Sequence, residues 1–353
     1  MPPDTLSHRV LNRTLLQRQH LLTRATLSPA DEIEHLLGLQ AQEALPPYVS
    51  LWSRLRDLDP TVVSAALERR TAVRLLLMRG TIHLVSPRDA LLLRALVQPQ
   101  LDRQAGTGQD SRRAAEVDRD DLRRAVATAL ADGPVPFAVL GELLGGTFPG
   151  VPETALAQRA RCEVPLVQVP PRGLWQRSGG VVVDLLQSWV ADEPVPDPDP
   201  AEVVRRYLCA YGPASAADVT TWSGITGMRA VLRSLEDELV PYRDERGRAL
   251  VDLAGVPLAE AETPAPVRLL GRYDNLWLSH ADRDRVTPDR EKRGRWMGSN
   301  GGLGATVFVD GALEGLWRRT PSGRVDVELF RRLTGGERAD LDTELDALET
   351  FLA

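Results

Sequence analysis

The sequence predicts an α+β protein built from three tandem copies of one helical unit and a C-terminal part rich in short strands. Three observations lead to this expectation. A pattern of three helices and a two-stranded hairpin recurs along the 353 residues, Gly-Pro pairs recur inside it, and short strands replace it from about Thr263. A recurring unit of this kind indicates tandem modules, which we expect at residues 1–105, 116–191 and 200–262, followed by residues 263–353.

The repeated unit has the order helix, helix, helix, hairpin. We expect its helices at 5–24, 30–39 and 60–70, then 118–131, 136–144 and 153–161, then 201–211, 214–222 and 227–238. We expect its hairpins at 73–85, 164–184 and 239–253. Gly133-Pro134 and Gly212-Pro213 each separate the first helix of a copy from the second. This is the layout of a winged helix, a variant of the helix-turn-helix module. A generic α+β segment is the alternative for any single copy, but three copies in register favour three winged helices.

The C-terminal part has strand patterns at 267–270, 306–309, 313–317 and 324–329, and then a helix at 336–352. Asp310-Gly311 between two apolar strands is a strong hairpin signal. We therefore expect a small β-barrel, or a strongly bent sheet, against which the terminal helix docks. Linkers are expected at Gly106–Ala115 and Asp192–Pro200, which are rich in Gly or Pro.

The composition excludes several classes of protein. No apolar run approaches the roughly 20 residues that cross a bilayer, and the first residues lack the pattern of a signal peptide, so we expect a cytoplasmic protein without a membrane partner. Cys162 and Cys209 cannot form a disulfide framework. Together with five scattered histidines they give no metal-ligand spacing, so we expect no metal and no cofactor.

The net charge of −6 conceals an uneven distribution. Arginines concentrate in residues 1–30 and 69–103, whereas the chain after Gly336 is acidic. Of the 43 basic residues only Lys292 is a lysine. Because arginine binds phosphate bidentately, the basic segments are compatible with a nucleic-acid partner, although ordinary solvated helix faces would look the same.

Two glutamines in a mostly apolar setting, in the run Gln40-Ala41-Gln42, suggest a polar site. Side chains two residues apart diverge on a helix but share a face in extended backbone. A helix that begins near Asp31, and that Pro46-Pro47 forces to stop, would unwind around Gln40 and let both amides enter one cleft. Surface glutamines near a helix end are the alternative.

Several short motifs in order resemble the AlkZ-type DNA glycosylases, winged-helix proteins of bacteria. The similarity extends over nearly the whole chain. It rests on Leu37–Gln42 with Pro46-Pro47-Tyr48, Leu51–Leu55, Arg79–Val85, Arg206–Leu208 with Tyr211-Gly212-Pro213, Trp222-Ser223-Gly224, Leu278–Arg283, Phe308–Gly311 and Gly315–Arg318.

This resemblance implies three winged helices and a C-terminal barrel arranged around duplex DNA that carries an alkylated guanine, with no cofactor. It also implies a monofunctional glycosylase acting on N7-alkylguanine, whose signature of Gln, apolar residue, Gln maps onto Gln40, Ala41 and Gln42. Some relatives unhook interstrand crosslinks and confer self-resistance to genotoxic natural products, and others remove monoadducts. The sequence does not choose between these lesions. We expect the protein to act as a monomer.

The residues fit this chemistry. N7 alkylation makes the guanine cationic, so its bond to the sugar breaks without a strong acid. What remains is to position a water and to favour positive charge on the sugar. We hypothesise that Gln40 and Gln42 hold that water. Because Lys292 and the N-terminus are the only amines available for a Schiff base, we predict no strand nicking beyond spontaneous breakage.

We expect DNA contacts from two places in the sequence. Arg54 and His83 belong to motifs near the glutamines, although His83 could instead be satisfied by neighbouring backbone. The segment Arg283–Asn300 leads into a Gly-rich tip that could probe a groove or brace a lesion that cannot be flipped out, or could be a disordered basic loop. Its expected contacts are Arg285, Arg290, Lys292, Arg293, Arg295 and Trp296.

Other interpretations carry less weight. Ser279, His280 and Asp282 invite a catalytic triad, but residues this close in sequence cannot usually form the relay. Asp274 and Asp282 could form a carboxylate pair, whereas ion pairs with nearby arginines are the simpler expectation. A winged-helix transcriptional regulator without chemistry would leave Gln40 and Gln42 without a role. A scaffold that binds other proteins would suit the overall acidity.

Overall fold

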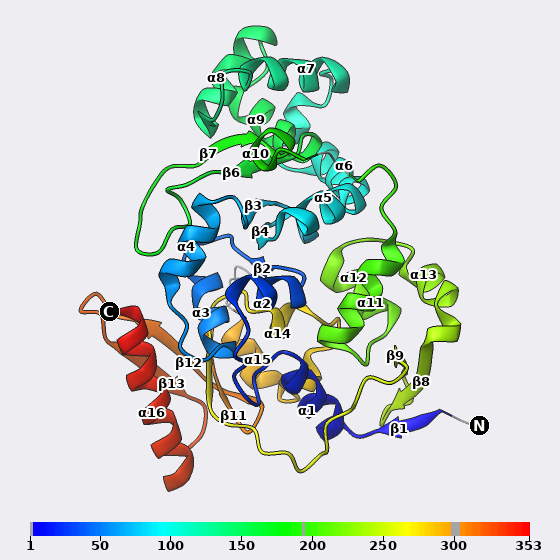
Figure 1. The fold of residues 1–353 in the computed structure, drawn as a ribbon, viewed down its shortest axis with the longest axis vertical. Helices are drawn as coiled ribbons and strands as arrows, with labels where there is room; N and C mark the ends of the chain where they lie inside the picture. The colour runs from blue at the N-terminus through cyan, green and yellow to red at the C-terminus, as the bar shows by residue number, and fades with distance from the viewer. Residues whose placement is uncertain (1–2, 193–194, 298–303) are drawn as a thin grey trace.

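The computed structural model describes residues 3–192, 195–297 and 304–353. The molecule is elongated, with a helical lobe at the top of Figure 1 and a larger body below it, on which the two termini lie at opposite sides. We call the lobe the upper lobe. Its helices are α7 (Arg119–Ala129), α8 (Phe137–Thr147) and α9 (Glu153–Glu163), at the positions expected from the sequence.

One six-stranded sheet joins the upper lobe to the body (Figure 1). Its strands, in the order β2-β4-β3-β6-β7-β5, are β2 (Leu39–Gln40), β4 (Ile82–Val85), β3 (Val73–Leu76), β6 (Leu166–Gln168), β7 (Val182–Leu185) and β5 (Val135–Pro136). The hairpins of the first two copies therefore do not project as two separate wings. Leu75 of β3 pairs with Val167 of β6, which satisfies a backbone edge that a separate wing would leave open.

The first copy contains more elements than the sequence predicts. Its helices are α1 (His8–Arg18), α2 (Pro29–His35), α3 (Pro46–Arg54), α4 (Pro60–Glu68), α5 (Pro87–Leu96) and α6 (Gln98–Thr107), and a short 3-10 turn η1 (Met78–Gly80) joins β3 to β4. The helix expected at 5–24 is shorter, because residues 4–6 form strand β1 (Asp4–Leu6) and the Ser7 side chain caps α1. Helix α3 was not expected, and Pro46-Pro47 occupies its first turn.

The third copy follows the expected order. Its elements are α11 (Pro200–Tyr211), α12 (Ala216–Ser223), α13 (Met228–Ser234), a 3-10 turn η3 (Glu236–Glu238), β8 (Leu239–Asp244) and β9 (Ala249–Leu253). Strand β1 pairs in parallel with β8 and completes a three-stranded sheet. Gly133-Pro134 lies between α7 and α8, and Gly212-Pro213 lies between α11 and α12, as the repeat pattern required.

The expected linker at 106–115 is ordered. Helix α6 continues to Thr107, and a 3-10 turn η2 (Ser111–Ala114) follows it. Arg159 of α9 donates a hydrogen bond to the Ala114 carbonyl, which attaches this turn to the upper lobe. A short helix α10 (Leu186–Val190) ends the second copy.

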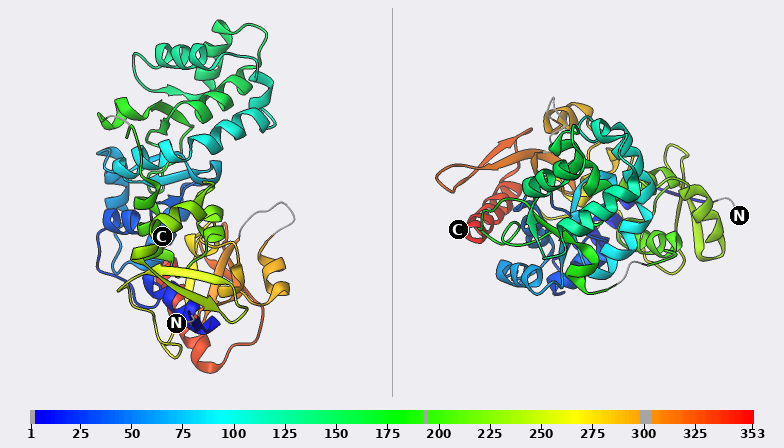
Figure 2. Two further views of the ribbon diagram at one scale, coloured as in Figure 1. Left: turned by 90° about the vertical axis from the view of Figure 1, so that its right-hand side faces the viewer. Right: turned by 90° about the horizontal axis from the view of Figure 1, so that it is seen from above.

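The C-terminal part does not form a barrel. Its four strands make an open antiparallel sheet in the order β10 (Arg268–Leu270), β11 (Ala305–Val309), β12 (Ala312–Arg319) and β13 (Val325–Leu329). Closure would require β10 to pair with β13, but these strands are the two edges of the sheet. The terminal helix α16 (Gly335–Leu352) lies against this sheet instead (Figure 2). Its leucines pack with Trp52 and Val267. Three short helical elements lie between β10 and β11: α14 (Asn275–Leu278), η4 (Arg283–Arg285) and α15 (Arg290–Trp296).

The hydrophobic core shows which parts of the chain pack together. One cluster of buried side chains runs through the first copy, the third copy and the C-terminal part, and it includes Leu15, Tyr207 and Phe308. The upper lobe has a core of its own around Leu122 and Leu156. The glutamine strand β2 therefore lies on the large body, with Leu39 and Ala41 buried in its core.

Candidate active site

Helix α2 ends well before the two glutamines. Leu37 and Gly38 both have positive φ, of 54° and 98°, and the Gly38 amide donates to the Ile33 carbonyl at 2.9 Å. A Cβ on Gly38 would lie 2.4 Å from the Val85 side chain, so only glycine fits here. The expectation that Pro46-Pro47 stops the helix is thus wrong, because Gly38 ends α2 and the prolines begin α3.

The backbone around Ala41 is extended. Gln40 stands opposite His83 across the β2–β4 pairing, and the Ala41 amide donates to the Ile82 carbonyl at 2.7 Å. The Ala41 carbonyl accepts from Arg74 Nη2, also at 2.7 Å. The prediction of non-helical backbone at the glutamine pair is confirmed. Both peptide groups of the buried Ala41 are held by β3 and β4.

Both glutamine side chains engage the same hairpin. Gln40 Oε1 accepts from Arg79 Nη2 at 3.0 Å, and Gln42 Oε1 accepts from the Ile82 backbone amide at 3.2 Å. Gln40 is 8% exposed, whereas Gln42 is exposed to solvent. Each carbonyl oxygen keeps a second lone pair, so both amides can still accept a hydrogen bond from a water or from DNA.

Arg79 is the site residue that the sequence did not single out. It lies in the turn between β3 and β4, and its guanidinium donates to Gln40 Oε1, His83 Nε2 and the Trp222 carbonyl. Burial, and to a lesser degree the charge of Arg283, lowers the pKa of Arg79 to about 10, so it is charged at neutral pH. None of its described partners is a carboxylate.

His83 is buried and neutral. Its Nδ1 lies 3.0 Å from the Thr81 carbonyl, which can only accept, so Nδ1 carries the proton and Nε2 accepts from Arg79 at 3.3 Å. Burial, reinforced by the charge of Arg79, lowers the pKa of His83 to about 3. With 1% of its surface exposed, the side chain has no room for a DNA backbone contact, and its partners are the nearby backbone and Arg79.

Arg54 is also unable to reach DNA in this structure. It is fully buried, and its guanidinium forms two hydrogen bonds with the Asp274 carboxylate, at 2.7 and 2.8 Å. A further bond goes to Gln19 Oε1 at 2.8 Å. Arg54 therefore ties α3 to the start of α14. The interpretation of Asp274 as an ion-pair partner is confirmed.

Most of the expected contacts in the basic segment have partners inside the protein. Arg285 is buried and donates to His280 Nε2, while Trp296 is buried and stacks on Trp277 with 3.8 Å between ring centroids. The three residues Lys292, Arg293 and Arg295 form ion pairs with Glu314, Asp284 and Glu328. Arg290 is exposed, and no ion pair involves it within the described part of the chain. The expected Gly-rich tip at 298–302 lies outside the described residues.

The Ser279 and His280 side chains do contact each other, with 3.0 Å between Oγ and Nδ1, but both are buried. His280 Nε2 is occupied by Arg285, and burial together with that charge lowers the pKa of His280 to about 3. Asp282 lies elsewhere, in ion pairs with Arg246 and Arg248. The triad interpretation is therefore wrong.

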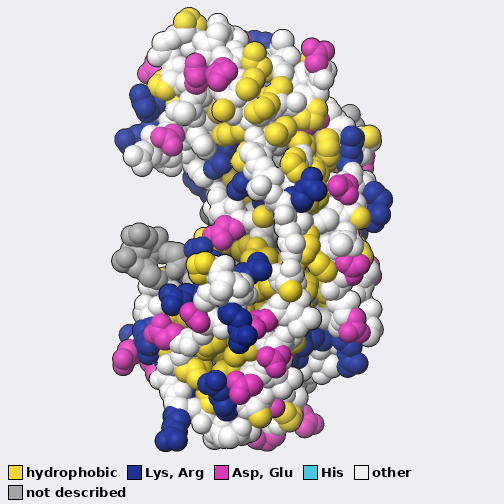
Figure 3. Space-filling model, turned by 90° about the vertical axis from the view of Figure 1, so that its left-hand side faces the viewer, with side chains coloured by type: hydrophobic (Ala, Val, Ile, Leu, Met, Phe, Trp, Pro, Cys, Tyr) yellow, Lys and Arg dark blue, Asp and Glu magenta, His cyan; other side chains and the backbone are white. Residues whose placement is uncertain are grey.

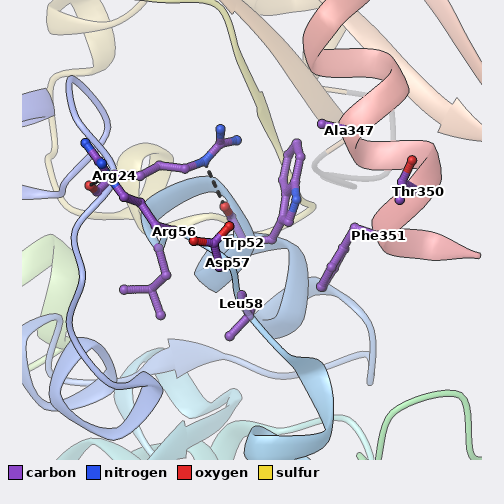
Figure 4. Close-up of a pocket in the computed structure, with 9 residues that line it drawn as sticks. Arg24, Trp52, Arg56, Asp57, Leu58, Ala347, Thr350 and Phe351 are labelled. Carbon is purple, nitrogen blue, oxygen red and sulfur yellow. Dashed lines mark hydrogen bonds between the residues drawn. The ribbon is translucent and has the colours of Figure 1, made fainter.

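Two hollows of the surface differ in character. Figure 3 shows a deep recess between the upper lobe and the body, with basic side chains on its walls. The other hollow is a cavity of about 540 Å³ between α3 and α16. Trp52 and Phe351 stack there, and Arg24 donates to the Trp52 carbonyl (Figure 4). None of the residues lining this cavity comes from the β2–β4 hairpin region, so it is separate from the glutamines.

Within the described residues no group of three His, Cys, Asp or Glu side chains could hold a metal, and no helix is long and apolar enough to cross a membrane.

Comparison with known proteins decides the family. A family model described as DNA glycosylase AlkZ-like matches residues 33–351. The chain belongs to the AlkZ-like DNA glycosylase family. It is therefore a DNA glycosylase, an enzyme whose substrate is DNA, and neither the regulator nor the scaffold is favoured.

One relative by sequence and one solved structure, both from the same organism, are similar to this chain. An interstrand DNA cross-link repair glycosylase of Streptomyces sahachiroi is 27% identical over 325 residues, which cover 86% of this chain and 85% of that protein. The structure of the DNA glycosylase AlkZ from S. sahachiroi matches with a TM-score of 0.81 over 99% of this chain and 97% of that chain, at 22% identity. This AlkZ-like glycosylase therefore shares the fold of that structure.

Proposed function

We propose that this AlkZ-like glycosylase hydrolyses the N-glycosidic bond of N7-alkylguanine in duplex DNA, interstrand crosslinks included, and acts as a monomer. A role in DNA repair or in self-resistance to a genotoxic natural product would follow from that activity. The cross-link repair glycosylase similar to this chain supports the choice of lesion. The observation that carries the proposal is the pair of neutral amides on one extended, fixed segment of backbone.

The hydrogen bonds around the pair fit a reaction that needs no strong acid or base. The described contacts of Gln40 and Gln42 are a guanidinium and a backbone amide, and His83 is held neutral. A glutamine amide cannot take a proton from water at neutral pH, but it can orient one through its carbonyl oxygen. Such a site suits a leaving group that is already cationic, because departure of alkylguanine needs no protonation.

The charge near the glutamines favours DNA phosphate. Arg79 and Arg283 influence each other electrostatically, and the described contacts of Arg283 are the Trp277 carbonyl, the Met297 sulfur and the face of Trp296. Neither arginine has a carboxylate partner among the described residues. A phosphate bound beside Arg283 would offset its charge and would also stabilise positive charge developing on the sugar. We therefore propose that Gln40 and Gln42 hold the water and that Arg283 and Arg290 contact the DNA backbone.

The recess beside the upper lobe offers space for bulky lesions (Figure 3). A crosslinked guanine is tethered to the opposite strand, so flipping it into an enclosed pocket is blocked. An open recess admits such a lesion while the glutamines act on the sugar from one side. We infer from this that bulky adducts and crosslinks are accepted alongside small adducts.

The test is release of base from duplexes that carry defined N7-guanine adducts of increasing bulk. Under single-turnover conditions the wild-type protein should release every adduct faster than spontaneous depurination. Gln40→Ala, Gln42→Ala double-variant protein should be slower by about 10²–10³-fold, the loss typical for removal of pre-organised hydrogen bonds. Gln187→Ala, a change at an exposed glutamine of α10, is the matched control. Wild-type rates in the double variant would contradict the assignment.

A second test addresses strand cleavage. Lys292, the chain's only lysine, has its Nζ 2.6 Å from Glu314 Oε2, so its amine is held in an ion pair. We propose a monofunctional enzyme that leaves an abasic site. Borohydride should therefore trap no protein–DNA adduct, and a covalent adduct would overturn the proposal.

A further inference from the structure

We propose that Arg79 is a positioning residue that fixes the amide of Gln40 for hydrolysis and makes its orientation depend on the docking of α12. This inference rests on the proposed function, because it assigns a role within the same site. It concerns a residue that contacts Gln40 and not the reacting atoms.

The conformation of the turn does not require an arginine at position 79. Arg79 has φ of 56° and Gly80 has φ of 67°, so both residues lie in the left-handed region. That region costs about 1 kcal/mol for a side chain with a Cβ, and glycine adopts it without strain. A turn selected for stability alone would favour Gly or Asn at position 79. The reason for an arginine therefore lies in what its side chain contacts.

Three neutral acceptors surround the guanidinium. They are Gln40 Oε1, His83 Nε2 and the Trp222 carbonyl. Partial burial of a charge without a carboxylate partner is unfavourable for stability. A partly buried charge that lowers stability and contacts Gln40 is typical of a functional site.

The contact fixes which way the Gln40 amide points. A guanidinium has only donors, so Gln40 must turn its oxygen towards Arg79 and its NH2 group away. The opposite orientation would place two donors against each other. His83 cannot replace Arg79 as donor, because its single proton is on Nδ1 and is donated to the Thr81 carbonyl. The order of donors and acceptors along this series of hydrogen bonds therefore allows only one orientation of the Gln40 amide.

The same guanidinium reaches a different part of the fold. The Trp222 carbonyl belongs to α12 of the third copy, 143 residues further along the chain. Gln100 of α6 secures the other side of the turn, since its amide oxygen, in the orientation that satisfies its surroundings, accepts from the backbone amides of Arg79 and Gly80 at 3.3 and 3.2 Å. Arg79 thus links the glutamine strand to α12. A shift of α12 would move the amide of Gln40 with it.

The test is a double-mutant cycle between Arg79→Gly and Gln40→Ala. Arg79→Gly removes the side chain and also relieves the left-handed backbone, so a loss of activity does not come from a strained turn. We expect the single-turnover rate of N7-alkylguanine release to fall by roughly ten- to hundredfold in Arg79→Gly, because a small displacement of a catalytic group has effects of that size. Affinity for the lesion duplex should change by less than about threefold.

Arg70→Gly is the matched control. Arg70 also has a left-handed φ, of 63°, but it is exposed, and its described contacts are with Trp189 and not with the glutamines. Its replacement should leave the rate within about twofold of wild type. If Arg79→Gly does not fold, Arg79→Lys replaces it in the cycle. This variant keeps the charge but not the planar fork, so its rate should be intermediate.

The decisive measurement is the effect of replacing Arg79 on the rate of base release by Gln40→Ala protein. If Arg79 acts through Gln40, its replacement should slow Gln40→Ala protein by less than about twofold. An equal loss in both backgrounds would show that Arg79 acts by another route, and an unchanged rate in the single variant would show no role. Both outcomes overturn the inference while leaving the proposed function intact. Absence of base release by the wild-type protein would instead contradict the proposed function itself.

Discussion

The arginines of this glycosylase differ between those that pair with carboxylates of the C-terminal part and those of the glutamine hairpin. Arg54, Arg293 and Arg295 are matched by Asp274, Asp284 and Glu328. Arg74 and Arg79, on either side of the Gln40-Ala41-Gln42 backbone, contact only neutral acceptors in the described structure. Paired arginines stabilise the fold, whereas the two at the hairpin hold the Ala41 carbonyl and the Gln40 amide of the candidate site. The comparison yields four predictions.

The largest effect is expected at the buried pair of Arg54 and Asp274. Asp274→Asn removes the carboxylate hydrogen-bonded to the buried Arg54 and leaves Glu32, 4.0 Å from Arg54 Nε, as the one described carboxylate to balance its charge. This change should lower the free energy of unfolding by about 3–5 kcal/mol. Burial alone would raise the pKa of Asp274, but the charge and hydrogen bonds of Arg54 outweigh it and lower that pKa. The pair therefore stabilises the protein above about pH 4 and loses its effect as the pH falls through the lowered pKa.

Denaturant unfolding at neutral pH measures this change. Asp326→Asn is the control, because Asp326 forms an exposed pair with Arg318 that should contribute less than about 1 kcal/mol. Equal losses in the two variants would remove the distinction between buried and exposed pairs.

Arg74→Met should separate activity from stability. Arg74 holds the Ala41 carbonyl, but its Nη1 is buried without a partner, and burial lowers its pKa to about 10. The lost hydrogen bond and the removed unpaired charge should nearly cancel, leaving the free energy of unfolding within about 1 kcal/mol of wild type. The base-release rate should fall about tenfold, because the glutamine backbone loosens. An unchanged rate would contradict this role.

The surface residues Arg290 and Arg295 offer the same contrast between an arginine without a described carboxylate partner and one with such a partner. Arg290 is exposed without a described ion pair, whereas Arg295 pairs with Glu328. Arg290→Met should weaken duplex binding severalfold and reduce the slope of log Kd against log salt by about one. Arg295→Met should change both quantities less. Indistinguishable salt slopes would mean that the internal pair does not decide which arginine contacts DNA.

The smallest expected effect is that of pH. The pKa of His83 is lowered to about 3 and that of Arg79 to about 10, so both groups keep one charge state across neutral pH. The rate of base release, corrected for spontaneous depurination, should be flat between about pH 5.5 and 8.5. An inflection near pH 6.5 that disappears in His83→Gln protein would show that His83 titrates during catalysis.

The fold was largely predictable where periodicity and turn signals agree. The helices of the second and third copies and the four C-terminal strands lie where their patterns place them. The errors arose where tertiary pairing decides. Nothing local in Leu75 or Val167 reveals that two hairpins join in one sheet, and four strand patterns do not tell an open sheet from a barrel. Gly38 was a local signal that was missed, since glycine after an apolar helix turn commonly ends a helix.

The site was predictable in its glutamines and much less so in its charges. The extended backbone at Ala41 followed from spacing and from the family resemblance. An arginine in the sequence does not show whether it has a carboxylate partner, so Arg54 and Arg79 looked alike, although one is matched by a residue 220 positions away and the other is not. Arg79 could have been found from its place beside Gly80 in a tight turn, where a long side chain needs a reason.

We expect the two neutral amides of Gln40 and Gln42 to restrict this enzyme to a base that is already cationic. The direct measurement compares single-turnover release of N7-methylguanine and of uracil from duplexes that otherwise have the same sequence. We predict release of the cationic base at least about a hundredfold faster than of the neutral one, since the site offers uracil no acid to assist its departure. Comparable rates for the two bases, or release of N7-methylguanine no faster than spontaneous loss, would contradict the account.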